Sequence, residues 1–443
     1  MEIILMMIKS LLLGAAAGIA ALGAAQAADL PMTKGEAVEY VKVCSTFGPG
    51  FFYIPGSDTC LKIGGEIRAD YRAFGGDTPV NVGKSQSFSR NDNRSAFNTQ
   101  GRIWFDARTQ TDWGLLRSYF QINADSHPIS AQGRGGTYNG NTFSIDKAFI
   151  QFGGLTAGYA HSFFGFYDNE YGDTIWAPYY AESSTVNLLA YTAQFGGGFS
   201  ATLSIEDGRD HRANAFDGLG VSPAGGFVYI QGGQQVPDVV GQLRYDADWG
   251  ALAVQAAAHQ NRSGEGTSTV ATSLGDPIVN SSKYGFAVGA TGLIKLPFID
   301  GGHFIVEGQY ADAATQYLGA GNTWLGATDR FIANTIPTRV NSGKGWSIVG
   351  ELGGNITPVL NANLVGSYID IKYDAARGGG AVDYSMNELT FAGNLTYTIV
   401  KGLSVAGEVS YTRVDQQNGF FNGTFHDAKA NTWEGGIRIK RTF

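Results

Sequence analysis

Charged and apolar residues alternate without a break in the stretch LKIGGEIRADYR, residues 61–72. Every charge falls on an even position, and the odd positions carry leucine, isoleucine, glycine, alanine and tyrosine. Because successive side chains of a β-strand point to opposite faces of the sheet, this alternation predicts one long strand with a polar face and an apolar face. The polar face mixes both charge signs densely, which is unusual for the sheet of a soluble protein.

The same alternation recurs along the chain up to its last residue. By this criterion we count about sixteen strands, an even number that lets the two ends of the sheet meet on the same side. The predicted strands cover residues 61–72, 99–110, 115–125, 143–152, 155–160, 187–195, 199–206, 241–249, 251–259, 283–296, 304–310, 346–352, 360–371, 389–397, 403–411 and 433–443.

The predicted connections alternate between short and long. Seven are tight turns, at residues 111–114, 153–155, 196–198, 246–250, 297–302, 355–359 and 400–402. Eight are long and polar, near residues 73–96, 126–142, 161–186, 207–238, 260–282, 311–344, 372–386 and 414–430. Tight turns at one rim and long loops at the other are typical of an outer-membrane barrel, with the turns in the periplasm and the loops outside the cell.

This pattern predicts an all-β fold, a transmembrane antiparallel β-barrel. In lipid no sheet edge can stay unpaired, so the strands must close, and sixteen strands leave an aqueous interior that side chains do not fill. The apolar positions of each strand then face lipid and the charged positions line a solvated pore wall. A secreted protein built from β-sandwiches is the alternative, but it would not alternate turns and loops over the whole chain.

The N-terminus carries the only long apolar run. Lys9 is followed by an apolar segment at 11–22 and then by Ala25-Gln26-Ala27, which predicts a cleaved signal peptide over residues 1–27. The apolar segment is too short for a spanning helix, which disfavours a membrane anchor. Glu2 is unusual in a signal peptide, so Met7 is a second candidate start.

Charge and cysteine content narrow the function further. The formal net charge of −8 is unchanged by removal of residues 1–27 and disfavours nucleic-acid binding. Cys44 and Cys60 are the only cysteines of an exported chain, so we predict one disulfide between them. We therefore divide the mature chain into an N-terminal segment at 28–60, which holds the disulfide, and a barrel at 61–443.

Catalytic motifs are absent from the sequence. It has no G-x-S-x-G, no H-E-x-x-H, no phosphate-binding loop and no Cys/His cluster. The histidines are scattered at His127, His161, His211, His259, His303 and His426. The sequence therefore disfavours an enzyme, and we expect neither a cofactor nor a metal site.

The stretch EYVKVCSTFGPGFFYIPGSDTCLKIGGEIRADY, residues 39–71, resembles the start of the mature general porins of alphaproteobacteria. The resemblance implies a trimeric sixteen-stranded barrel that passes small hydrophilic solutes by passive diffusion, with its third loop folded into the lumen. It also implies a place in the outer membrane, in contact with lipid and lipopolysaccharide. A substrate-selective channel and a surface adhesin on the same scaffold remain as alternatives.

By this resemblance, the third long connection at 161–186 is the constriction loop. It has no basic residue, and its acidic residues are Asp168, Glu170, Asp173 and Glu182. The first three strands carry basic residues on the lumen face, at Lys62, Arg68, Arg72, Arg102, Arg108 and Arg117. Opposite charges across a narrow aqueous gap would create a transverse field that orients dipolar solutes.

The two ends of the mature chain carry further candidate features. Phe443 is a C-terminal aromatic, the expected signal for the machinery that assembles outer-membrane barrels, although Arg441 interrupts the apolar face of the last strand. An arginine near the membrane interface can extend its charge to the head groups at small cost. At the other end, Ala28-Asp29 is a candidate for attachment to peptidoglycan.

Overall fold

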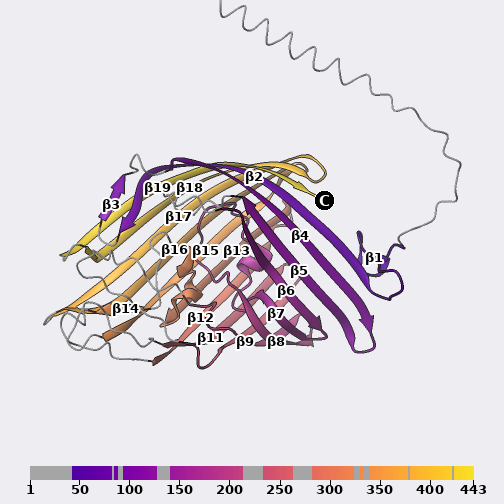
Figure 1. The fold of residues 1–443 in the computed structure, drawn as a ribbon, viewed down its shortest axis with the longest axis horizontal. Coiled ribbons are helices and arrows are strands. Elements are labelled where there is room, and N and C mark those ends of the chain that lie inside the picture. The colour runs from indigo at the N-terminus through magenta and orange to yellow at the C-terminus, as the bar shows by residue number, and fades with distance from the viewer. Residues whose placement is uncertain are drawn as a thin grey trace, which may run out of the picture. The chain divides into compact units, whose positions relative to one another are not determined.

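A computed structural model describes residues 42–81, 84–87, 93–126, 140–212, 233–262, 282–323, 330–333, 339–377, 380–421 and 424–443. Contacts divide the chain into two compact units, Met1–Val43 and Cys44–Phe443, and the second unit holds the barrel (Figure 1). The predicted signal peptide and the Ala28-Asp29 candidate lie outside the described residues and stay predictions.

Sixteen long antiparallel strands of the described chain form the barrel. They are β2 (Cys60–Asn81), β4 (Ser95–Thr111), β5 (Gly114–Ser126), β6 (Thr142–Phe152), β7 (Leu155–His161), β8 (Thr185–Gly196), β9 (Phe199–Glu206), β10 (Asp238–Ala247), β11 (Gly250–Arg262), β12 (Ser282–Lys295), β13 (Asp300–Asp312), β15 (Arg339–Thr357), β16 (Leu360–Arg377), β17 (Gly380–Val400), β18 (Leu403–Phe421) and β19 (Thr424–Thr442). Each pairs with the next, and β19 pairs with β2 from Thr432↔Gly76 to Thr442↔Glu66. The predicted closed barrel of sixteen strands is confirmed.

Short elements complete the described part of the fold. Three are strands, β1 (Phe52–Tyr53), β3 (Lys84–Ser87) and β14 (Arg330–Ala333). The others are helical turns, η1 (Ser45–Phe47), α2 (Tyr167–Glu170), η2 (Thr315–Leu318) and η3 (Ala320–Asn322). Within the described residues, no helix has the length and apolar character needed to cross a membrane.

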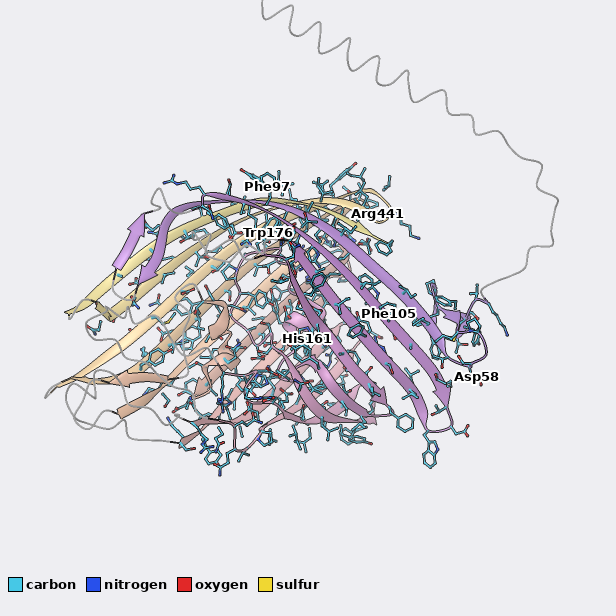
Figure 2. All side chains as sticks on the ribbon, viewed as in Figure 1. Asp58, Phe97, Phe105, His161, Trp176 and Arg441 are labelled. Carbon is cyan, nitrogen blue, oxygen red and sulfur yellow. A yellow bond between two sulfur atoms is a disulfide. The ribbon has the colours of Figure 1, made fainter. Side chains whose placement is uncertain are left out.

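The alternation of residues 61–72 separates the two faces of β2 as predicted. On the outer face Ile63 and Ile67 are about half exposed, whereas Glu66, Asp70 and Arg72 on the lumen face are buried. The other strands repeat this arrangement, and many of their outward side chains are large and apolar, such as the Phe97 ring (Figure 2). The outer surface therefore suits lipid, and the polar residues line the interior.

Glycine and tryptophan mark the rim of tight turns. Gly198, between β8 and β9, has φ +87°, and a Cβ there would lie 2.0 Å from the carbonyl oxygen of Asp246, so only glycine fits this turn. Trp113 and Trp249 occupy two other turns and are exposed. Both indole rings thus lie at the same rim, where an aromatic girdle meets the membrane interface.

The last two predicted loops are shorter in the structure than the sequence pattern predicts. β16 and β17 pair as far as Arg377↔Gly380, and β18 and β19 as far as Phe421↔Thr424, so each connection is a tall hairpin with a short tip. The sequence alternation is lost in these segments because outside the membrane neither face of a strand needs to be apolar. Backbone pairing continues there without that signal.

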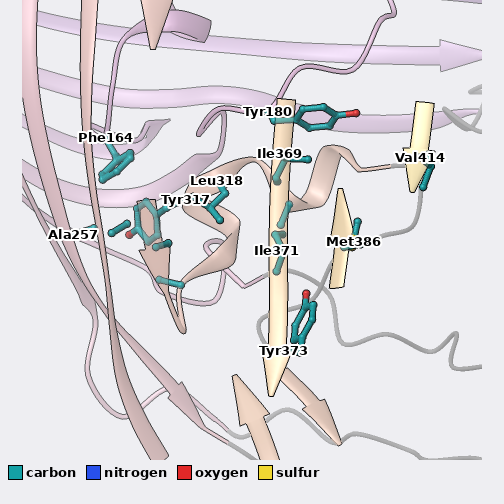
Figure 3. Packing of buried hydrophobic residues seen from close by; sticks show 14 of the residues in the cluster. Phe164, Tyr180, Ala257, Tyr317, Leu318, Ile369, Ile371, Tyr373, Met386 and Val414 are labelled. Atoms are coloured by element: carbon teal, nitrogen blue, oxygen red, sulfur yellow. The ribbon is translucent and has the colours of Figure 1, made fainter. Parts of the chain in front are cut away.

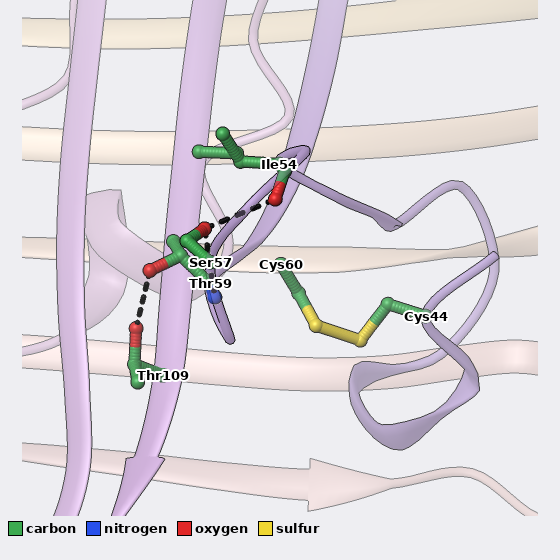
Figure 4. Close-up of a disulfide and its surroundings, with 6 residues drawn as sticks. All are labelled: Cys44, Ile54, Ser57, Thr59, Cys60 and Thr109. Atoms are coloured by element: carbon green, nitrogen blue, oxygen red, sulfur yellow. Dashed lines mark hydrogen bonds between the residues drawn. A yellow bond between two sulfur atoms is a disulfide. The ribbon is translucent and has the colours of Figure 1, made fainter. Parts of the chain in front are cut away.

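The N-terminal segment from Cys44 packs with the barrel. β1 pairs with β2, and the predicted disulfide between Cys44 and Cys60 is present (Figure 4). Thr59 Oγ1 lies 2.9 Å from Thr109 Oγ1 of β4. Residues 44–59 therefore belong to the same compact unit as the strands, and the division at residue 60 does not separate compact units.

Loss of the disulfide should loosen the N-terminal segment without unfolding the barrel. In the double variant Cys44→Ser/Cys60→Ser we expect residues 45–59 to become sensitive to protease, because the cross-link closes a short loop and stabilises it by about 3 kcal/mol. The barrel should stay folded, since its ladder does not depend on this bond. Limited proteolysis and the heat-modifiable gel mobility of the purified protein measure the two effects, and loss of the folded band would contradict the prediction.

Candidate functional site

The third long connection runs from β7 to β8 inside the barrel (Figure 1). We call residues 162–184 the lumen loop; they include α2. Their hydrogen bonds reach inward-facing residues of β9, β13, β15, β16, β17, β18 and β2. The expected folding of this loop into the lumen is confirmed.

Glu307 of β13 holds the first turn of the lumen loop. Its Oε2 accepts hydrogen bonds from the backbone N–H groups of Phe166 and Tyr167, each at 3.2 Å, and from Thr291 Oγ1 at 2.7 Å. Gly165 passes so close that a Cβ there would lie 2.4 Å from Glu307 Oε1, and its φ is +84°. The loop approaches this carboxylate only because residue 165 is glycine.

Glu351 of β15 and Glu408 of β18 continue the attachment. Glu351 Oε2 accepts from the N–H of Asp173 at 3.0 Å and from the hydroxyl of Tyr167 at 2.7 Å. Glu408 accepts three consecutive backbone N–H groups, those of residues 175–177, at 2.7–2.8 Å. Both carboxylates are almost fully buried, so these charge-assisted bonds satisfy donors that an irregular loop would otherwise leave unpaired.

Apolar packing fixes the two ends of the lumen loop. Phe164 and Tyr180 are buried in a cluster that also contains Tyr317 and Leu318 of η2 (Figure 3). The Tyr180 hydroxyl donates to Glu388 Oε2 at 2.9 Å. The loop therefore emerges from a packed region inside the barrel and presents only part of its length to water.

Glu182 is buried with a histidine and does not line the lumen. Its side chain is 1% exposed, and its Oε1 lies 3.6 Å from Nδ1 of His211, whose Nε2 is 2.7 Å from Glu206 Oε2. Burial alone would lower the pKa of His211, but the carboxylates of Glu182 and Glu206 outweigh it and hold this pKa well above its ordinary value. As a correction, Glu182 is a partner of His211 and is left out of the constriction.

The other three acidic residues lie on the open side of the lumen loop. The Asp168 side chain is about a quarter exposed and accepts from the hydroxyl of Tyr179. Glu170 forms an ion pair with Arg244 of β10, in which Nη2 and Oε2 are 3.0 Å apart. The Asp173 side chain is half exposed.

The six predicted basic residues fall into two groups. Arg68 and Arg102 lie on adjacent strands and stay partly exposed, although both form ion pairs with Glu66, Arg102 at 3.7 Å. The register places Lys440 of β19 opposite Arg68. Arg438, two residues earlier on β19, pairs with Asp70 at 2.6 Å. These four cations, Arg68, Arg102, Arg438 and Lys440, form what we call the basic wall.

The other four predicted cations are ion-paired or lie over an aromatic ring. Arg72 is buried in an ion pair with Glu434. Arg108 and Arg117 share the carboxylate of Asp106, at 2.7 and 2.9 Å. Lys62 and Arg108 lie over the ring of Phe51, beside the disulfide-linked segment.

The lumen loop reaches the basic wall at Trp176. The indole Nε1 donates to Asp70 Oδ2 at 3.2 Å, and the ring centroid is 5.3 Å from the Arg438 guanidinium. The ring also occupies the space above Gly436, where a Cβ would meet it at 2.7 Å. Acidic loop and basic strands thus meet in the same part of the lumen.

Several site residues were missed by sequence reasoning. Arg244, Arg438 and Lys440 lie on later predicted strands, whereas the predicted basic residues all lie on the first three. The wall carboxylates Glu307, Glu351 and Glu408 were missed because a lone glutamate on a pore wall resembles an ordinary solvated charge. A usable signal was present: each is the only charged residue of its predicted strand.

The His211 cluster makes stability depend on pH. Because the pKa of His211 is raised in the folded state, its contribution is complete below the unfolded value of about 6.5 and is lost as pH rises through the folded pKa. We expect the native protein to unfold at a lower temperature in alkaline buffer, with a loss of about 2 kcal/mol. The variant His211→Gln should unfold at a lower temperature than the wild type at pH 6, and its unfolding temperature should change little with pH. A pH dependence equal to that of the wild type would contradict the assignment.

Comparison with known proteins places the chain in a family. Residues 29–436 match the Porin subfamily. Porin Omp2b of Brucella abortus (strain 2308) is 30% identical over 99% of this chain and 100% of that protein, and Porin Omp2b of Brucella suis biovar 1 is 29% identical over the same shares. The outer membrane channel DcaP of Acinetobacter baumannii shares the fold, with TM-score 0.61, 16% identity and coverage of 88% of this chain and 99% of that one. The chain belongs to the Porin subfamily and is an outer-membrane porin.

Proposed function

We propose that small hydrophilic solutes and ions cross this porin by passive diffusion, through a constriction between the lumen loop and the basic wall. The observation that carries the proposal is the attachment of the loop to buried wall carboxylates, which leaves Asp173 half exposed and Asp168 partly exposed. The opposite boundary carries Arg68, Arg102 and Lys440.

The lumen loop contacts the opposite wall directly. The Trp176 indole donates to Asp70, which pairs with Arg438 of the basic wall at 2.6 Å. Fixed charges of opposite sign in a narrow channel with low-dielectric walls produce a strong local field. Such a field supports passage of polar solutes, which align with it, and slows apolar solutes, which must displace oriented water.

A substrate-selective channel is the second candidate. The observation that favours it is the Trp176 ring beside Arg438 of the basic wall, which offers an anionic solute both charge and an apolar surface. A general pore passes solutes at a rate proportional to their concentration. A selective channel would show flux that saturates with one solute, so a flux titration in liposomes separates the two. An adhesin is the third candidate, and neither observation favours it. The proposed channel function requires no catalytic activity.

Assembly and partners complete the proposal. We infer a homotrimer from the resemblance of residues 39–71 to trimeric porins. Recognition of Phe443 by the barrel assembly machinery is supported by its exposed ring and by its backbone, which closes the ladder with Gly65 at 2.9 and 3.1 Å. Arg441 donates to the carbonyl of Lys401 in a tight turn, which places its charge at the rim rather than in the lipid core. Lipopolysaccharide would contact the outer rim.

Neutralising the acidic side should change ion preference. In the variant Asp168→Asn/Asp173→Asn we expect the reversal potential in a salt gradient to shift toward anions, because the loop then opposes the basic wall with two fewer negative charges. Planar-bilayer recordings of the purified protein measure this shift. The matched control is Asp112→Asn/Asp248→Asn, which removes the same charge from exposed residues in two tight turns. Equal reversal potentials in both double variants would contradict the proposed constriction.

Weakening one wall carboxylate should loosen the lumen loop. Glu408→Gln keeps one neutral acceptor oxygen and turns the other into an NH2 donor, so at least one backbone N–H loses its acceptor. At a cost of about 2 kcal/mol, we expect noisier and larger single-channel currents. The control is Val409→Leu, a change on the lipid face of the same strand. Currents of Glu408→Gln that match those of the wild type would show that the loop does not limit the pore.

A further inference from the structure

Three potential metal ligands meet where the lumen loop touches β13 and β15. Asp173 of the loop, His303 of β13 and Glu351 of β15 each offer one nitrogen or oxygen atom, and these atoms all lie within 4.8 Å of one another. His303 Nε2 is 2.9 Å from Glu351 Oε1 and 3.9 Å from Asp173 Oδ2. The sequence gives no indication of this group, because its members are separated by more than a hundred residues or lie on different strands.

The histidine is oriented for ligation. Its Nδ1 is 3.1 Å from the carbonyl oxygen of Gly301, an atom that only accepts hydrogen bonds, so Nδ1 carries the proton and Nε2 faces the carboxylates. A backbone acceptor on one ring nitrogen is the usual arrangement for a metal-bound histidine. The Tyr171 ring lies 4.6 Å from the imidazole and covers it. Glu351 Oε2 accepts the hydrogen bonds from the lumen loop, and Glu351 Oε1 lies next to His303.

A fourth oxygen nearby has no partner. Asn363 of β16 is buried, and its Oδ1 makes no hydrogen bond. Its Nδ2 donates to Asn361 at 2.7 Å and to Asn394 at 3.1 Å, which fixes the direction of Oδ1. A Cβ on Gly353 would lie 1.9 Å from this oxygen and 2.9 Å from His303 Nε2, so both atoms border the small space that Gly353 leaves open.

We propose that this cluster binds a divalent transition-metal cation of the Zn²⁺ class. The ligands would be His303 Nε2 and carboxylate oxygens of Asp173 and Glu351, and Asn363 Oδ1, on the His303 side, would be the fourth. An imidazole combined with carboxylates suits Zn²⁺ and disfavours Mg²⁺, which takes oxygen ligands and keeps its water.

The distances between the ligand atoms of the cluster are close to those of a tetrahedral zinc site. Tetrahedral ligands at about 2.1 Å from zinc lie about 3.4 Å from one another. The two separations at His303 Nε2, 2.9 and 3.9 Å, lie on either side of that value. Asp173 is half exposed to the lumen, so a cation can enter past its side chain and the carboxylate can adjust.

Binding would also tie the loop to the wall. Asp173 belongs to the lumen loop, whereas His303 and Glu351 belong to the barrel, so one cation would join the two and cancel the negative charge of Asp173. The metal site stands on the cluster alone, and the reduced current that we expect on binding rests on the proposed constriction.

The test is zinc binding to the purified full-length porin in detergent, measured by isothermal titration calorimetry with ZnCl₂ and, for comparison, MgCl₂. We expect one zinc site per chain, no detectable magnesium binding, and at least tenfold weaker zinc binding in His303→Gln and in Asp173→Asn. The control is Asp300→Asn, which removes an exposed carboxylate at the start of the same strand and should bind zinc as the wild type does. Heat-modifiable gel mobility verifies that each variant is folded.

Absence of zinc binding to the wild type, or equal binding in the wild type and both cluster variants, would overturn the proposal and leave the group as a hydrogen-bonded anchor. Bilayer recordings provide the second readout. Zinc should reduce the wild-type current reversibly, with recovery after addition of a chelator. Zinc binding in the calorimeter without any change of current would support the metal site and contradict the proposed constriction at Asp173.

Discussion

Buried carboxylates of the barrel wall bind the backbone of the lumen loop, and the pore depends on this interaction. Glu307, Glu351 and Glu408 together accept six backbone N–H groups from residues 166–177. A loop of irregular structure inside a barrel needs such acceptors, because its amide groups cannot pair with a neighbouring strand. The carboxylates need the loop in turn, since an unpaired buried charge would be strongly destabilising.

This mutual requirement explains the arrangement of charge in the lumen. The loop backbone occupies Glu307, Glu351 and Glu408, so β13, β15 and β18 offer few free charges to solutes. The loop supplies Asp168 and Asp173 instead, and the strands around the closure between β19 and β2 supply the cations. The proposed transverse field would then act between the acidic lumen loop and the cations of β2, β4 and β19.

The barrel was predictable from the sequence, and the detailed site only partly so. Alternation within a strand is a local signal, which is why the faces of residues 61–72 and the turn at Gly198 follow directly from neighbouring residues. Closure is not local: it brings Lys440 opposite Arg68, a contact that no pattern within one strand reveals. The same holds for Glu182, whose acidic character suggested a pore residue although the fold buries it against His211. The tall hairpins were missed because alternation ends where the membrane ends.

Amide hydrogen exchange of the lumen loop tests the central claim most directly. In the purified barrel, the N–H groups of Phe166, Tyr167, Asp173 and residues 175–177 should exchange about as slowly as those of the neighbouring strands β13, β15 and β18. Protection should weaken at 175–177 first when Glu408 is replaced by glutamine. Exchange of these amides at the rate of an unstructured loop would contradict the account, because the wall carboxylates would then not hold the loop in the lumen.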